Sequence, residues 1–247
     1  MKATGIIPAR WGSTRFPGKP LHLIAGKALV RRVWERCKRA TSLDSVIIAT
    51  DDMRIADAAF NWGADVAMTS PNHASGTDRI AEVVQNAKQF AFIVNIQGDE
   101  PLIDPQLINK IVEKLRSDRA VQIVTAAHPF EHPKDALSPH QVKVVVDLAG
   151  TALYFSRARI PFQENDRTLS LRHQGIYGFR RSALLQFVTW KPSPLERAES
   201  LEQLRALENG VKVHVLITAK GSPGIDTLAD AEALEQKLAR ARGRISR

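Results

Sequence analysis

The first half of the chain alternates short apolar runs with stretches in which apolar residues recur every three or four positions. Short apolar runs predict buried strands, and the three- and four-residue spacing predicts helices with one face packed on a sheet. This alternation favours an α/β domain with a parallel sheet. The expected strands span residues 4–8, 46–49, 66–68 and 92–96, and the expected helices span residues 28–40, 53–62, 77–88 and 105–115.

The pattern changes at about residue 121, where strand-like segments follow one another with only short connections. We expect antiparallel additions here, so that residues 121–180 form a smaller β lobe on a single domain spanning residues 1–247. The ligand should lie beyond the carboxyl ends of the parallel strands. The strands expected in this half are 123–128, 142–146, 152–155 and 211–218, and the helices are 182–189, 194–207 and 228–240.

The chain is basic, with a net charge of +9 and a pI near 9.9, which raises the question of a nucleic-acid partner. Part of the excess lies in the tail 237–247, where five basic residues face no acidic one. No run alternates aromatic with basic residues, as stacking on single-stranded bases requires. We therefore expect no nucleic acid as a partner, and a nucleic-acid-binding protein is the rival from another functional class.

Cysteine usage and hydropathy bear on the compartment. Cys37 is the only cysteine, so the chain cannot build a disulfide framework, and a reducing cytoplasm fits best. The N-terminus lacks the apolar core of a signal peptide, and no later stretch approaches the roughly 20 apolar residues that a membrane span needs. We expect a cytoplasmic protein that does not insert into membranes.

The segment 7–20 follows the first expected strand and gathers cations, hydroxyls and glycines. Glycines let the backbone come close to a ligand, while Arg10, Arg15 and Lys19 can neutralise a polyphosphate or a leaving pyrophosphate. The segment is not a Walker phosphate loop, because its glycine spacing is one residue too long and Pro20 stands where the metal-binding hydroxyl belongs. A basic surface loop is the alternative interpretation.

Two acidic positions are candidates for holding a metal ion. Asp99 follows the most apolar expected strand of the first half, beside a glycine that leaves room for phosphates. Mg2+ prefers one or two carboxylates together with phosphate oxygens. Asp226 follows a glycine-rich turn and precedes the last expected helix. An ordinary acidic turn is the alternative for Asp99, and a helix N-cap is the alternative for Asp226.

Other polar residues stand where a ligand could bind. The segment 72–79 enters an expected helix whose first N–H groups could face a nucleotide, and helix capping by Ser75 or Thr77 is an equal alternative. In the second half, polar side chains beside apolar patterns are candidates for ligand contact or for satisfied core positions. They are Arg157, His173, Tyr177 and Glu202.

Several motifs resemble those of the cytidylyltransferase family that acts on KDO (3-deoxy-manno-octulosonate), and the resemblance runs nearly from end to end. The pattern PAR-x-x-S-T-R-x-P-G-K is typical of the wider family of sugar cytidylyltransferases. The KDO branch is indicated more specifically by SGTDR with QGDEP, YFSRARIP, RHQGIYGF and LEQLR. One departure is Trp11, where relatives often carry tyrosine, and another is the short segment 162–170.

The resemblance implies a set of roles for matching positions. Nucleotide binding falls to Pro8, Ala9, Arg10, Ser13, Arg15, Lys19, Ser75, Gly76 and Arg79. Catalysis falls to Arg10, Arg15, Lys19 and Asp99, and Mg2+ would be held by Asp99 and Asp226. Sugar binding falls to Gln97, Tyr154, Arg157, His173, Tyr177 and Glu202. Arg157 would meet the sugar carboxylate, since a guanidinium pairs two N–H groups with the two carboxylate oxygens.

The implied reaction is attack by the anomeric hydroxyl of KDO on the α-phosphorus of CTP, giving CMP-KDO and pyrophosphate for lipopolysaccharide or capsule biosynthesis. CTP and KDO are the implied substrates, Mg2+ the cofactor and a homodimer the assembly. The implied fold is Rossmann-like, a mostly parallel sheet flanked by helices as in nucleotide-diphospho-sugar transferases. A cytidylyltransferase for another acidic sugar, 8-amino-KDO or a sialic acid, is the nearest alternative.

Overall fold

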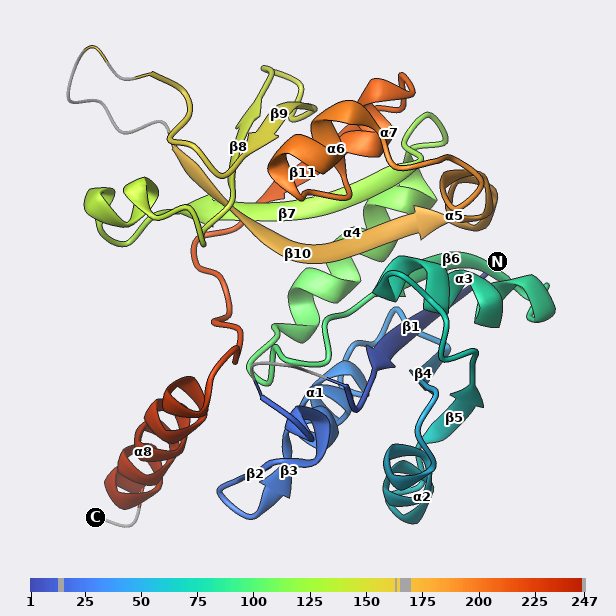
Figure 1. Ribbon diagram of the computed structural model, residues 1–247, viewed down its shortest axis with the longest axis vertical. Helices are drawn as coiled ribbons and strands as arrows, with labels where there is room; N and C mark the ends of the chain where they lie inside the picture. Colours follow the sequence, from blue (N-terminus) through green and yellow to red (C-terminus); the bar gives the residue numbers. More distant parts are fainter. Residues whose placement is uncertain (13–15, 163, 165–169, 246–247) are drawn as a thin grey trace.

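A nine-stranded mixed sheet runs through the protein, with helices on both faces (Figure 1). The computed structural model describes residues 1–12, 16–162, 164 and 170–245, and side chains as far as residue 240. The strand order along the sheet is β11-β7-β10-β6-β1-β4-β5, with β8 paired to β10 and β9 to β8. Neighbours on the main path are parallel except the two pairs that β10 makes. The expected α/β class is confirmed.

The four strands expected in the first half are present and parallel. The apolar side chains of β1, β4 and β6 are mostly buried between the helices on the two faces, whereas β5, at the end of the sheet, is only partly buried and leaves Met68 50% exposed. Their carboxyl ends meet at one edge of the sheet, where loops from distant parts of the chain come together. The strands are β1 (Lys2–Ala9), β4 (Ser45–Thr50), β5 (Asp65–Met68) and β6 (Phe90–Asn95).

The second half completes the same sheet. Strands β7 and β10 lie inside it, whereas β8 and β9 form a hairpin on its edge. The strands of segment 121–180 thus belong to the same sheet as the rest of the protein. That this segment forms a distinct smaller lobe stays a prediction. The strands are β7 (Ile123–Pro129), β8 (Lys143–Val146), β9 (Ala152–Ser156), β10 (Leu171–Arg180) and β11 (Val213–Ile217).

Strand β10, of ten residues, was not predicted from the sequence pattern. It contains Gly175 and Gly178, which weaken a strand signal. Gly178 is needed for packing, because a Cβ there would lie 2.2 Å from the Ile111 side chain of a covering helix. Glycine therefore lets that helix rest directly on the strand at the centre of the sheet.

The helices of the first half form where the periodicity predicted them. They are α1 (Leu29–Cys37), α2 (Met53–Asn61), α3 (Gly76–Asn86) and α4 (Pro105–Ser117). Helices α1, α2 and α4 bury their apolar stripes on one face of the sheet, and α3 packs on the other together with α5 (Arg181–Phe187). Asp104 caps α4 by accepting a hydrogen bond from the Gln106 N–H at 3.0 Å, and Pro105 occupies the first helical position, where its missing N–H costs nothing.

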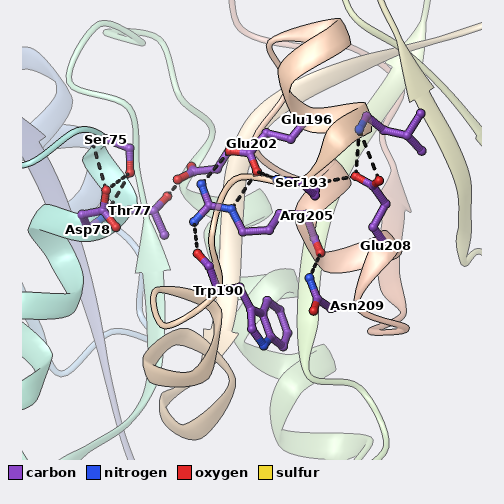
Figure 2. Close-up of polar contacts among 11 residues, drawn as sticks. Ser75, Thr77, Asp78, Trp190, Ser193, Glu196, Glu202, Arg205, Glu208 and Asn209 are labelled. Atoms are coloured by element: carbon purple, nitrogen blue, oxygen red, sulfur yellow. Dashed lines mark hydrogen bonds and ion pairs between the residues drawn. The ribbon is translucent and has the colours of Figure 1, made fainter.

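The single helix expected over residues 194–207 is wrong. The structure has two short helices, α6 (Pro194–Glu199) and α7 (Leu204–Glu208), separated by Ser200 in the left-handed conformation with φ 53°. Figure 2 shows that the Arg205 guanidinium turns back to form a paired contact with the Glu196 carboxylate. This ion pair joins α7 to α6, which periodicity alone could not show.

The last helix, α8 (Leu228–Ile245), begins where the sequence predicted and lies apart from the main sheet at the end of an extended segment (Figure 1). It packs beside the small hairpin β2 (Leu23–Ile24) and β3 (Lys27–Ala28). Ile225, Ala231 and Leu234 join a separate apolar cluster there. This docking carries the residues just before α8 to the first loop of the chain. Of the helices that the structure describes, none combines the length and apolar character that crossing a membrane would take.

Candidate active site

A cavity of about 260 Å³ opens at the carboxyl ends of β1 and β6, beside the first turn of α3. This is the edge at which the sequence predicted a ligand. The cavity lining unites candidates from segments far apart in the chain. They are Pro8, Ala9, Arg10, Lys19, Ser75, Gly76, Arg79, Gln97, Asp99 and Asp226. Ser13 and Arg15 lie outside the described residues.

Close backbone approach shapes the floor of this cavity. A Cβ on Gly98 would lie 3.0 Å from the Pro8 carbonyl oxygen, and a Cβ on Gly76 would lie 3.2 Å from the Pro8 ring. Contacts that tight leave no room for a larger residue without displacement of the neighbour. The two glycines therefore let the β6 loop and the start of α3 close on the end of β1.

Two carboxylates converge on one ammonium group in the cavity. Lys19 Nζ lies 2.6 Å from Asp99 Oδ2 and 3.6 Å from Asp226 Oδ1. A backbone hydrogen bond of 2.9 Å from the Ile225 N–H to the Asp99 carbonyl holds the two loops together. The cationic first loop and both acidic candidates thus meet at a single point.

The capping interpretation of Asp226 is wrong. Thr227 caps α8 instead, because its Oγ1 accepts the Asp230 N–H at 3.2 Å. The Asp230 carboxylate in turn accepts the N–H groups of Asp226 and Thr227. The Asp226 carboxylate is therefore not used in the cap, and it lies next to Lys19.

The donor set of the cavity fits Mg2+ bound together with phosphates. Among the residues that the structure describes, no group of three or more His, Cys, Asp or Glu side chains could hold a metal. Asp99 and Asp226 supply two carboxylates, which is the number that Mg2+ takes when phosphate oxygens and water complete its shell. The cation that they already share, Lys19, shows that one positive charge can sit between them.

The start of α3 forms the opposite wall of the cavity. Ser75 is the N-cap: its Oγ accepts the Asp78 N–H at 3.1 Å, and the Asp78 carboxylate accepts the Ser75 N–H in return. Ser75 therefore caps the helix. The capped helix start also borders the cavity, so capping does not exclude contact with a ligand. Arg79 is buried and fixed in place by Asp51 and Thr69.

His73 also lines the cavity, although the sequence motifs indicated no role for it. Its ring Nε2 contacts the Glu82 carboxylate, which lies on α3 and also accepts the Ser70 N–H at 2.9 Å. The contact with His73 is the main cause of the lowered pKa of Glu82. The only sequence signal for His73 is its place in the segment before α3.

The six sugar-binding candidates are spread over a wider region. Gln97 lines the cavity with Asp99, and His173 borders an adjoining cavity of about 200 Å³ that also includes Asp99 and Asp226. Tyr154 lies on β9. Arg157 donates to the backbone oxygens of Glu199, Pro139 and Ser200, so its guanidinium is held by main chain.

Glu202 and Tyr177 border a small cavity together with Thr77. The Thr77 hydroxyl donates to Glu202 Oε2 at 2.7 Å, which joins the first turn of α3 to the segment between α6 and α7 (Figure 2). Burial raises the pKa of the Glu202 carboxyl. The hydrogen bond therefore links the wall of the first cavity to the region of the sugar candidates.

His173 should make the protein sensitive to acid. Burial lowers its pKa to about 3, in a setting of aromatic rings from Phe155 and Tyr177. An unfolded histidine binds a proton below a pH of about 6.5, and folded His173 does not. As the pH falls from 6.5 towards 3, protons therefore favour the unfolded state, and the free energy of unfolding decreases by up to about 1.4 kcal/mol per pH unit.

Urea unfolding at several pH values checks this expectation with His173→Gln as the comparison. Glutamine can hydrogen-bond to Thr125, as His173 does at 2.9 Å, and it does not titrate. The variant should lose stability less steeply than wild type between pH 6.5 and pH 4. Equal slopes for the two proteins would contradict a lowered pKa of His173 in the folded protein.

The comparisons with known proteins agree with this geometry. A family model described as Cytidylyltransferase matches residues 4–213. The 3-deoxy-manno-octulosonate cytidylyltransferase of Geobacter sulfurreducens is 48% identical over 250 residues, covering 96% of this chain and 100% of that protein. Its counterpart from Chlamydia abortus is 43% identical over 238 residues, covering 96% of this chain and 94% of that protein.

Solved structures show the same relationship. A CMP:2-keto-3-deoxy-manno-octonic acid synthetase complexed with CTP superposes with a TM-score of 0.94 and 39% identity, covering 98% of this chain and 100% of that chain. The 4-diphosphocytidyl-2C-methyl-D-erythritol synthase of Anaerococcus prevotii shares the fold alone, with a TM-score of 0.68 and 16% identity over 96% of both chains. The expected fold class is confirmed. By family model, full-length identity and fold, the chain belongs to the 3-deoxy-manno-octulosonate cytidylyltransferase family.

Proposed function

We propose that this enzyme transfers CMP from CTP to the anomeric hydroxyl of KDO, giving CMP-KDO and pyrophosphate. The observation that carries the proposal is the convergence of Asp99 and Asp226 on Lys19, in a cavity walled by the first turn of α3. Cations and carboxylates arranged in this way suit a nucleoside triphosphate with its metal ion. The relatives of known name, at 43% to 49% identity, point to KDO as the acceptor.

The protein's own groups bind and orient the two substrates. Arg10 and Lys19 face the triphosphate and stabilise the negative charge that develops on the departing pyrophosphate. Holding the sugar hydroxyl in line with the α-phosphorus recovers roughly 7 to 11 kcal/mol of the barrier, and no covalent enzyme intermediate is needed. Mg2+, which Asp99 and Asp226 would hold, supplies further charge neutralisation on the phosphates. Ser75, Gly76 and Arg79 are our candidates for contact with cytosine.

On the sugar side, Gln97 and His173 each border a cavity that also includes Asp99 and Asp226. Arg157 is our candidate for binding the sugar carboxylate. Tyr154, Tyr177 and Glu202 are our candidates for contacts with the rest of the sugar. Two further proposals accompany the activity: the enzyme works as a homodimer in the cytoplasm, and its product enters lipopolysaccharide or capsule biosynthesis. The buried single thiol of Cys37 suits a reducing compartment.

Pyrophosphate release with a panel of sugars tests the function. The purified enzyme is incubated with CTP, Mg2+ and either KDO, 8-amino-KDO or a sialic acid, and we expect rapid release with KDO. If pyrophosphate is released with another sugar but not with KDO, that other sugar is the acceptor and the assignment of KDO is wrong. Salt-sensitive binding to a DNA duplex without any pyrophosphate release would favour the nucleic-acid-binding rival.

Lys19 should matter more for turnover than for CTP binding. Lys19→Met keeps most of the side-chain length and removes the charge, so we expect kcat to fall about 100-fold and the KM for CTP to change less than about 5-fold. Steady-state pyrophosphate assays separate the two constants. Lys110→Met, on the outer side of α4, is the matched control and should behave as wild type. A raised KM with an unchanged kcat would assign Lys19 to ground-state binding alone.

A further inference from the structure

Glu100 follows Asp99 directly, and its buried side chain borders the adjoining cavity of about 200 Å³ that also includes Asp99 and Asp226. Only 7% of Glu100 is exposed, although a carboxylate is seldom buried without partners. Its Oε2 accepts hydrogen bonds from the Ser222 hydroxyl at 2.6 Å and from the Gln174 side-chain amide at 2.9 Å. A third bond of 2.8 Å, from the Gln174 amide to Ser222 Oγ, closes the triangle.

The three residues come from three separate parts of the fold. Glu100 belongs to the loop after β6, Gln174 to β10, and Ser222 to the extended segment that leads to Asp226. Each part carries or adjoins a candidate site residue: Asp99 precedes Glu100, His173 precedes Gln174, and Asp226 follows Ser222 by four positions. The triangle therefore ties the loops that carry Asp99 and Asp226 to a strand at the centre of the sheet.

Secondary structure does not hold the segment from Ser222 to Asp226 in place, because this segment lies outside the helices and strands. Its backbone joins the loop after β6 through the bond of 2.9 Å from the Ile225 N–H to the Asp99 carbonyl. The Glu100 triangle adds a second attachment between the same two loops, through buried side chains. A misplacement of about 1 Å in a reactive site can cost on the order of 100-fold in rate.

Building on the proposed function, we propose that Glu100 is a positioning residue: through Ser222 and Gln174 it sets the separation of Asp99 and Asp226, and thereby the affinity for Mg2+. It acts by accepting hydrogen bonds and does not itself touch the metal or the substrates. Replacing groups that hydrogen-bond directly to metal ligands typically changes metal affinity or activity by about 10- to 100-fold, and we expect an effect of that order from Glu100 through the positions of the two loops. Ser222, which supplies the hydroxyl of the triangle, acts in the same way.

Two replacements of Glu100 separate hydrogen bonding from charge. Glu100→Ala removes the acceptor, and the Mg2+ concentration for half-maximal pyrophosphate release should rise about 10- to 100-fold. Glu100→Gln keeps a carbonyl oxygen for both donors and should stay within about 3-fold of wild type. A loss with Glu100→Gln as large as with Glu100→Ala would overturn the proposal, because Glu100 would then act through its charge.

Hydrogen exchange gives a readout that needs neither Mg2+ nor turnover. In Glu100→Ala, amides of residues 221–226 should exchange at least about 10-fold faster than in wild type, while those of β1 and β4 stay unchanged. Ser222→Ala should show the same faster exchange in residues 221–226. If Glu100→Ala does not fold, Ser222→Ala tests the proposal in its place. Wild-type exchange in this segment together with a wild-type Mg2+ requirement would overturn the proposal.

Ser193→Ala is the matched control. Ser193 also donates its hydroxyl to a carboxylate, that of Glu208, but it lies at the start of α6 and outside the residues of either cavity described above. This variant should unfold more easily and keep the wild-type Mg2+ requirement, which separates a general loss of stability from misplaced aspartates. If wild type releases no pyrophosphate with any sugar, the proposed function fails, and hydrogen exchange still decides whether the triangle holds the segment.

Discussion

Asp99→Asn should lower the rate of pyrophosphate release at least about 1,000-fold while the protein stays folded. Asparagine has the shape of aspartate and lacks its charge, so the cavity would lose one of the two carboxylates that meet Lys19. The Asp99 side chain is 31% exposed, and exposed ion pairs contribute only about 0 to 1 kcal/mol to stability. A pyrophosphate assay and a thermal melting curve on the same preparation measure the two effects.

Asp118→Asn is the matched control for this experiment. Asp118 also pairs with a lysine, Lys114 at 3.1 Å, but it lies at the end of α4 and 41% of its side chain is exposed. Its replacement should leave the rate of pyrophosphate release unchanged. Near-normal turnover by Asp99→Asn would remove the metal role assigned to Asp99, and with it the interpretation of the paired aspartates.

Arg205→Met should destabilise the protein more than any of the other replacements, by about 3 to 5 kcal/mol in the free energy of unfolding. The Arg205 and Glu196 side chains are 8% and 11% exposed, and two hydrogen bonds of 2.7 and 2.5 Å join them. The guanidinium also donates to the Trp190 carbonyl and lies over the Phe187 ring. Methionine fills much of the space but leaves the Glu196 carboxylate buried without its partner.

Urea denaturation measures the effect, and a double replacement isolates its cause. Glu196→Gln removes the charge and keeps an oxygen that can accept the Ser193 N–H of the helix cap. In the Arg205→Met background it should therefore recover part of the lost stability, since no buried charge is left unpaired. If the double variant is less stable than Arg205→Met alone, packing around Arg205 matters more than the ion pair.

Much of the fold was predictable because local patterns specify it. The strands and helices of the first half have strong apolar periodicity, and each formed close to its expected bounds. The break between α6 and α7 was not predictable in this way. Leucine and alanine continue the helical spacing across Ser200, and the turn is held by contacts between side chains and other parts of the fold, among them Arg205 with Glu196 and Thr77 with Glu202. Strand β10 was not predicted because Gly175 and Gly178 interrupt its apolar pattern, and Gly178 serves the packing of α4.

The sequence by itself determined the α/β class and the residue types of a cationic loop and two acidic loops, because these depend on neighbours a few positions apart. Only the tertiary structure decided that Asp226 meets Asp99 and Lys19, and that Glu100 ties their loops together. These facts depend on the docking of α8 and on contacts between residues more than 100 positions apart. Spacing along the chain does not specify such contacts, since the packing of the whole sheet brings them about.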